Sequence, residues 1–160
     1  MGAPQRFPVA DERRATIQAM NAWSAARGGG DLPDVGAVFD GSCRIGDGEF
    51  LIMVDGDNHD SVFIVCGADI PLRPGERGIG SSVARAVAPS QRDMFCEACS
   101  EAVRDGVAVH REWKTNVPPH DTVRYRCNFL PMRSGLDVGN MYVFGAFGSK
   151  NCRAAERDVA

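Results

Sequence analysis

The sequence predicts an α+β domain, in which a five-stranded antiparallel sheet carries helices on one face and an amphipathic helix precedes the first strand. Three observations lead to this fold class. Residues 11–27 repeat their apolar positions at a helical spacing, two strand-like segments follow before residue 70, and three more follow residue 106. Because the strands do not alternate one by one with helices, a doubly wound parallel sheet is excluded.

The first element is a helix predicted over Asp11–Arg27. Acidic residues stand in its first turn, and Ile17, Met20 and Trp23 lie near helical spacing. The glycines at Gly28–Gly30 end it. The apolar stripe of this helix is expected to pack either on the sheet or on a second copy of itself, and the sequence does not choose between them.

Two adjacent strands come next. The segments FLIMV (residues 50–54) and SVFIVC (residues 61–66) are rich in β-branched and aromatic residues. The intervening DGDNHD supplies the Asp, Gly and Asn that hairpin turns require. An antiparallel hairpin is therefore predicted.

A second helix is predicted after a proline- and glycine-rich stretch at residues 71–80, which excludes any long regular element there. The helix follows Pro89, with Ser90 as its cap, and ends at Gly106. Its buried face is expected to consist of Met94, Phe95, Ala98, Cys99, Ala102 and Val103.

Three further strands are predicted at Val107–Lys114, Thr122–Leu130 and Asn140–Phe147, with a hairpin turn over residues 131–139 before the last. The middle strand alternates. Its apolar side is expected to be buried and its polar side to face water. The apolar residues are Val123, Tyr125, Cys127 and Phe129, and the polar residues are Arg124, Arg126 and Asn128.

Composition limits the classes of function. A chain of 160 residues with a formal net charge of −3 fits one domain and has no overall attraction to nucleic acid or to anionic membranes. Its apolar runs are too short to cross a bilayer, and no secretion signal is visible at the start. The six cysteines are therefore interpreted as reduced thiols, and a cytoplasmic location is expected.

This element order resembles the PAS family, whose five-stranded sheet is split two-plus-three around a helical insertion. The final hairpin, Tyr125–Gly148, resembles that family, and Trp23 with the following Ala-Arg-Gly and Leu32-Pro33 resembles a PAS subgroup common in alphaproteobacteria. The resemblance implies an N-terminal helix and loop over residues 1–30, a PAS-like core over 31–148 and a tail over 149–160. It also implies a sensory or signalling domain of the bacterial cytoplasm.

By the same resemblance, a small ligand or a protein partner is expected to bind, and a conformational or dimerisation signal to be relayed. The candidate ligand pocket consists of Tyr125, Cys127, Phe129 and Phe144. Arg124 and Arg126, with Arg111 and Lys114 near them, form a candidate surface for an anion or an acidic partner. A homodimer through the N-terminal helix is expected. Because only residues 149–160 follow the last strand, the chain is interpreted as a stand-alone module or as part of a larger sensor.

No cofactor or metal is assigned. Haem-binding PAS domains usually supply a histidine from the helix before the third strand, and Ser90–Asp105 has none. His59 and His120 fall in polar turns, and His110 lies in a strand. The photoreceptor-like letters Asn-Cys-Arg at residues 151–153 follow the last strand, where that family does not place its flavin cysteine. The acids Asp55, Asp57 and Asp60 lack the rest of a calcium loop.

Two alternatives stay open. Cys96 and Cys99 have the CxxC spacing of a redox sensor, although they stand about two turns into the predicted helix and not at its start. Zinc would need a second ligand pair, for which Cys43, Cys66, Cys127 and the three histidines are candidates without paired spacing. A small α+β enzyme with a ligand pocket is the other alternative, but the predicted inward positions are nearly all apolar, so no catalytic residue is assigned.

Overall fold

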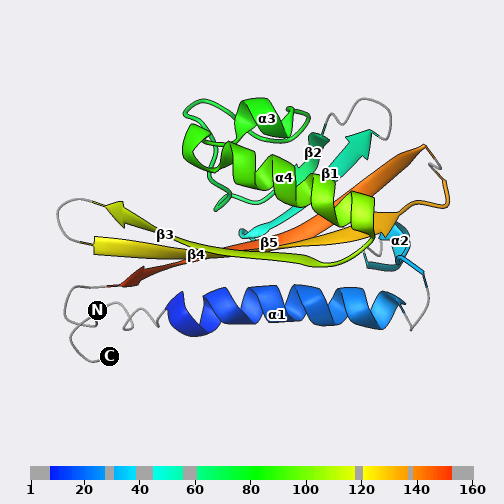
Figure 1. Ribbon diagram of the computed structural model, residues 1–160, viewed down its shortest axis with the longest axis horizontal. Helices are drawn as coiled ribbons and strands as arrows, with labels where there is room; N and C mark the ends of the chain where they lie inside the picture. Colours follow the sequence, from blue (N-terminus) through cyan, green and yellow to red (C-terminus); the bar gives the residue numbers. More distant parts are fainter. Residues whose placement is uncertain are drawn as a thin grey trace.

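The computed structural model describes residues 8–27, 31–38, 45–55, 61–117, 121–136 and 139–152. Within these ranges the chain forms four helices and five strands (Figure 1). In chain order they are α1 (Pro8–Arg27), α2 (Val35–Val38), β1 (Glu49–Asp55), β2 (Ser61–Cys66), α3 (Val83–Ala86), α4 (Pro89–Asp105), β3 (Val109–Val117), β4 (Asp121–Arg133) and β5 (Asn140–Cys152).

The five strands make one antiparallel sheet in the order β2-β1-β5-β4-β3. The first hairpin and the last three strands therefore meet where β1 pairs with β5 at the centre. The segment that holds α3 and α4 connects β2 on one border to β3 on the other. This arrangement confirms the predicted α+β class and the two-plus-three division of the strands.

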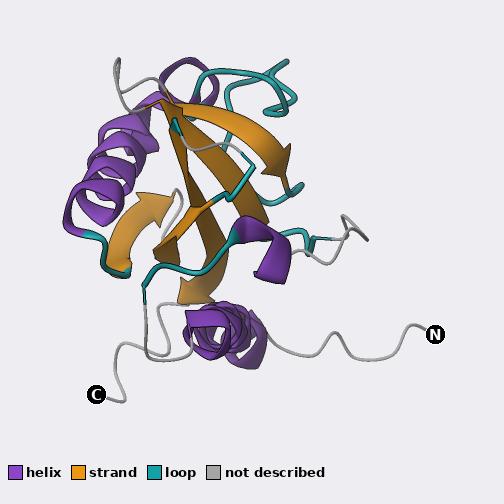
Figure 2. Cartoon of the chain, turned by 90° about the vertical axis from the view of Figure 1, so that its right-hand side faces the viewer, coloured by secondary structure: helices purple, strands orange, loops and turns teal. Residues whose placement is uncertain are grey.

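Helices cover both faces of the sheet. The helices α3 and α4 pack on one face, here called the α4 face, and α1 lies across the opposite face, here called the α1 face (Figures 1 and 2). The expectation of a single covered face with a wet polar side is therefore wrong. The cause is that α1 packs on the protein's own sheet, which is one of the two alternatives that the sequence left open. Trp23 and Met20 of the predicted stripe take part, whereas Ile17 is 50% exposed and does not.

Four phenylalanine rings fill the middle of the α4 face. Phe50 of β1 contacts Phe63, Phe95 and Phe129, with ring centroids 6.4, 5.7 and 5.6 Å away. Phe95 of α4 meets Phe129 of β4 edge to face at 5.3 Å. All four side chains are fully buried, so the space between α4 and the central strands is closed here.

On the other face, α1 is fixed to β4 by packing and by a hydrogen bond. Ala19 and Trp23 are buried against Leu130 and Met132. The Trp23 Nε1–H group donates to the carbonyl oxygen of Pro131 at 2.7 Å. Because a buried indole N–H without an acceptor would destabilise the fold, this bond specifies where the helix sits on the sheet.

Asn128 makes a second connection to α1. The pairing of β4 with β5 stops after Cys127 and resumes at Leu130. In the gap, the Asn128 side-chain Oδ1 accepts a hydrogen bond from the Ala146 backbone N–H at 2.8 Å, and its Nδ2 donates to the Thr16 carbonyl oxygen at 2.8 Å. Asn128 is almost completely buried, so one side chain joins β4, β5 and α1.

The helix ends and strand ends refine the sequence prediction. Helix α4 begins with Pro89 at its first position, so Ala88 is its N-cap and the prediction of Ser90 is wrong by two residues. Gly106 ends the helix as predicted, in the left-handed conformation with φ 64°. The strands β3, β4 and β5 all run further towards the C-terminus than predicted. The added residues of β3 and β5 pair with the first residues of β4, and β4 continues through Pro131 to Arg133, which pair with β5.

Candidate functional site

Three aromatic side chains, one each from β3, β4 and β5, contact one another on the α4 face. Trp113 stacks on Tyr125 with ring centroids 5.2 Å apart and planes 19° apart. Tyr125 in turn stacks on Phe147 at 5.5 Å and 30°. Trp113 and Tyr125 are only partly buried, unlike the four phenylalanines beside them. Trp113 and Phe147 are themselves 6.0 Å apart, so the three rings contact one another, and we call Trp113, Tyr125 and Phe147 the aromatic cluster.

The predicted pocket residues do not share one face. Tyr125, Cys127 and Phe129 alternate along β4 and lie together on the α4 face. Phe144 lies on the α1 face, because β5 places it opposite Leu130, which packs under α1. The grouping of Phe144 with the other three is therefore wrong. The residue of β5 that lies opposite Cys127 is Phe147, because the pairing register of β4 and β5, which the sequence did not reveal, puts it there.

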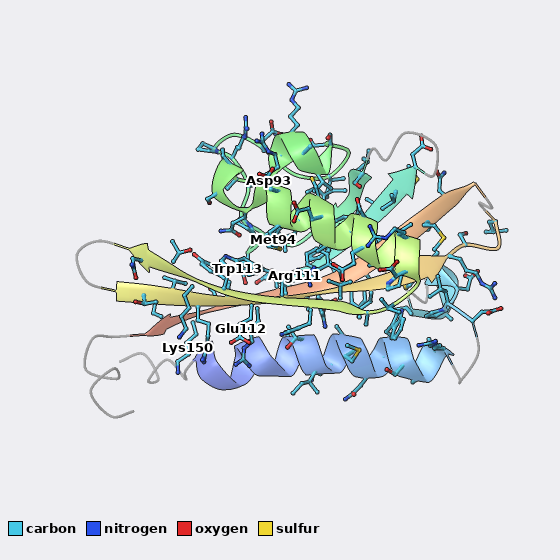
Figure 3. All side chains as sticks on the ribbon, viewed as in Figure 1. Asp93, Met94, Arg111, Glu112, Trp113 and Lys150 are labelled. Atoms are coloured by element: carbon cyan, nitrogen blue, oxygen red, sulfur yellow. The ribbon has the colours of Figure 1, made fainter. Side chains whose placement is uncertain are left out.

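The ends of this predicted pocket differ in how closely they are packed. At the Phe129 end, rings from β1, β4 and α4 touch one another and leave the residue fully buried. At the Tyr125 end, the ring contacts Trp113, and Figure 3 shows Trp113 between the sheet and the helix that carries Met94. Met94 is itself only partly buried. Of the predicted pocket residues on this face, only Tyr125 is partly exposed, since Cys127 and Phe129 are fully buried.

The described thiols are held in their neutral form. Cys99 and Cys127 are buried, and burial raises the pKa of both thiols far above the ordinary value. Burial raises the pKa of Cys66 to about 11 and also raises the pKa of Cys96. Since the thiolate is the reactive species, none of the four is activated for exchange at neutral pH.

The two predicted anion-binding arginines share one acidic neighbour on the α1 face. Glu112 Oε1 lies 3.4 Å from Arg126 Nε and 3.9 Å from Arg124 Nε. The arginine side chains are 13% and 25% exposed, respectively, so the expectation that they lie on an open, wet surface is wrong. Arg126 is the more enclosed of the two, since it lies further along β4 towards the residues that α1 covers.

Two lysines extend this charged region. The register places Lys114 of β3 and Lys150 of β5 directly on either side of Arg124, so three cations stand in one row across the sheet. Figure 3 shows Lys150 and Glu112 on the side of the sheet where α1 lies. Adjacent like charges repel, and a bound anion or carboxylate would relieve that repulsion. Arg111 does not belong to this row, because it projects to the α4 face and pairs with Glu101.

The structure describes only some of the remaining predicted residues. His110 is exposed on β3, on the face opposite Val109 and Trp113 as expected. Among the residues that the structure describes, no three His, Cys, Asp or Glu side chains are grouped as metal ligands. Several candidates lie outside the described residues, namely Gly28–Gly30, Cys43, Asp57, His59, Asp60 and His120.

The structure defines an α+β domain whose five-stranded antiparallel sheet is consistent with a PAS-like fold, with the aromatic cluster on its α4 face and a charged row on its α1 face. No protein-family model matches this chain, and no curated protein is similar enough to count as a relative. Of the helices described here, none has the length and apolar character needed to cross a membrane.

Proposed function

We propose that this protein is a PAS-type sensory or signalling domain of the bacterial cytoplasm, which binds a small ligand or a protein partner and relays a conformational signal without chemical catalysis. The observation that supports this most strongly is the connection between the two faces of the sheet at Asn128. Its neighbours in β4, Cys127 and Phe129, belong to the α4 face, whereas its own side chain bonds α1 and β5.

The relay would work through displacement of β4. A ligand that stacks on Trp113 or Tyr125 shifts the residues of β4 that follow, because side chains on one strand move with their shared backbone. Asn128 then changes its distance from the Thr16 carbonyl and the Ala146 N–H, both now 2.8 Å away. Since hydrogen bonds weaken steeply outside their preferred geometry, such a shift favours the state in which α1 is released.

A thiol-based redox sensor is less well supported. Cys96 lies in the middle of α4, its pKa is raised, and Cys99 beside it is buried. A redox sensor needs an accessible thiol of lowered pKa.

A double-mutant cycle tests the relay. Phe129→Leu alters the α4 face and Trp23→Phe alters the α1 face, and these side chains belong to separate core clusters. Distant, independent sites add within about 0.5 kcal/mol, so a relay through β4 predicts a larger coupling energy in urea denaturation. Additive effects would contradict the relay.

A separate experiment addresses the ligand. Native mass spectrometry and an absorbance spectrum of the protein from its source cells would identify a retained ligand.

A further inference from the structure

The outer edge of β3 is unpaired. This strand is the last in the sheet order, and it pairs with β4 along its whole length from Val109 to Val117 (Figure 1). Within the described residues, no backbone hydrogen bond joins its other edge to another segment. Nine residues at about 3.4 Å each give an edge of roughly 30 Å, which is long enough to template the addition of another strand.

The charged side chains along this edge are complementary to those of a second, antiparallel copy of the same strand. On the α1 face, β3 carries Glu112 and then Lys114, two residues apart. Lys114 is exposed, and no described carboxylate lies within ion-pair distance of it. On the α4 face, the partly buried Trp113 stands between them. A strand of the opposite direction with the same sequence therefore presents a lysine where this one has a glutamate.

We propose that β3 pairs antiparallel with β3 of a second copy of this chain, about a twofold axis that lies midway between the two Trp113 residues. In this register Glu112 faces Lys114 of the second copy, Lys114 faces its Glu112, and the two Trp113 residues face each other. The result is a continuous ten-stranded sheet with an isologous interface, in which each charged contact occurs twice.

The alternative registers are less favourable. A twofold axis perpendicular to the sheet keeps each side chain on its own face, so in every such register one residue of β3 stands directly opposite its own copy. If that residue is Arg111, Glu112 or Lys114, two identical charges face each other, which destabilises a strand pair. Among these four central positions, Trp113 alone gives a neutral centre flanked by opposite charges.

The aromatic cluster does not occupy the free edge. The described rings that contact Trp113 belong to β4 and β5, with Tyr125 5.2 Å and Phe147 6.0 Å away, so they come from the strands on the inner side of β3. The second Trp113 would meet the first at the interface. Glu101 of α4 pairs with Arg111, which precedes Trp113 in β3, so this part of α4 lies to one side of the axis. The twofold places the same part of the second α4 on the opposite side of the axis.

Sedimentation of the purified protein over a range of concentrations tests this interface. The wild type is expected to form a reversible dimer. Lys114→Glu replaces two attractive contacts with two Glu–Glu contacts and should raise the dimer dissociation constant about tenfold or more. Lys150→Glu is the matched control, since it makes the same charge change in the same row but on β5, away from the edge. Its dissociation constant should equal that of the wild type.

Two further variants separate this interface from a dimer through α1. Mixing Glu112→Lys protein with Lys114→Glu protein should restore a heterodimer, because each lysine then faces a glutamate. Ile17→Lys changes the exposed side of α1, where Ile17 is 50% exposed, and should leave the wild-type dimer intact. Circular dichroism checks that each variant folds.

Three results would overturn the proposal: a wild-type monomer at about 100 μM, a Lys114→Glu dimer as tight as the wild type, or loss of the dimer in Ile17→Lys alone. The proposed interface does not depend on the signalling role, because it involves only the β3 edge. A failed double-mutant cycle would leave it standing.

Discussion

Replacing Asn128 with alanine should destabilise the protein by about 3 kcal/mol. Asn128 is 1% exposed and makes two side-chain hydrogen bonds of 2.8 Å. The change leaves the buried N–H of Ala146 without its acceptor, at a cost of about 1–3 kcal/mol, and the bond to the Thr16 carbonyl contributes about 1 kcal/mol more. For a protein of this size, the loss corresponds to a melting temperature roughly 9 °C lower.

The assay is urea denaturation of both proteins, with amide hydrogen exchange measured in parallel. The Ala146 amide should lose protection by a larger factor than its neighbours in β5, because it loses its own acceptor in addition to the overall stability. A loss of stability below about 0.5 kcal/mol would refute the reasoning, since it would mean that backbone pairing or water replaces the Asn128 side chain without cost.

Three further predictions concern single positions. Gly145→Ala places a Cβ 2.2 Å from both the Asn128 carbonyl oxygen and a Phe50 ring atom, so the variant should lose about 3 kcal/mol or fail to fold, as thermal melting will show. Gly106→Ala adds a Cβ in open space but at φ 64°, so urea denaturation should give a loss of only about 1 kcal/mol, all of it from backbone strain. Burial raises the pKa of Cys66 to about 11, because the folded state favours the neutral thiol. The contribution of this thiol to the free energy of unfolding is complete below pH 9.0, the ordinary pKa, and is lost as the pH rises towards 11. Wild type should therefore lose more stability than Cys66→Ala over that pH range, and equal losses would contradict the assignment.

The sequence predicted the elements well because each is encoded locally. The helical spacing of Ile17, Met20 and Trp23, the turn residues between β1 and β2, and Gly106 after α4 all act within a few residues of themselves. The fold class then followed from the order of the elements. Where a helix end was misplaced, at Ser90, the competing signal was Pro89, whose fixed φ already suits the first helical position.

The predicted site was less accurate because it depends on register between distant strands. Phe144 and Phe147 are both apolar, and only the pairing of Leu130 with Phe144 decides which of them lies beside Cys127. Asn128 was read as a solvent-facing residue, since a polar residue in an alternating strand ordinarily faces water. Its burial results from the docking of α1, about 110 residues earlier in the chain.

Hydrogen exchange in α1 tests the central claim most directly, namely that the α4 face and α1 are coupled through β4. The measurement compares wild type with Phe129→Leu, whose changed side chain belongs to the core on the far face from α1. The account predicts that the free energy of opening for the amides around Trp23 falls by more than the global free energy of unfolding. A decrease equal to or smaller than the global one would show that α1 does not respond to the α4 face, and would contradict the proposed relay.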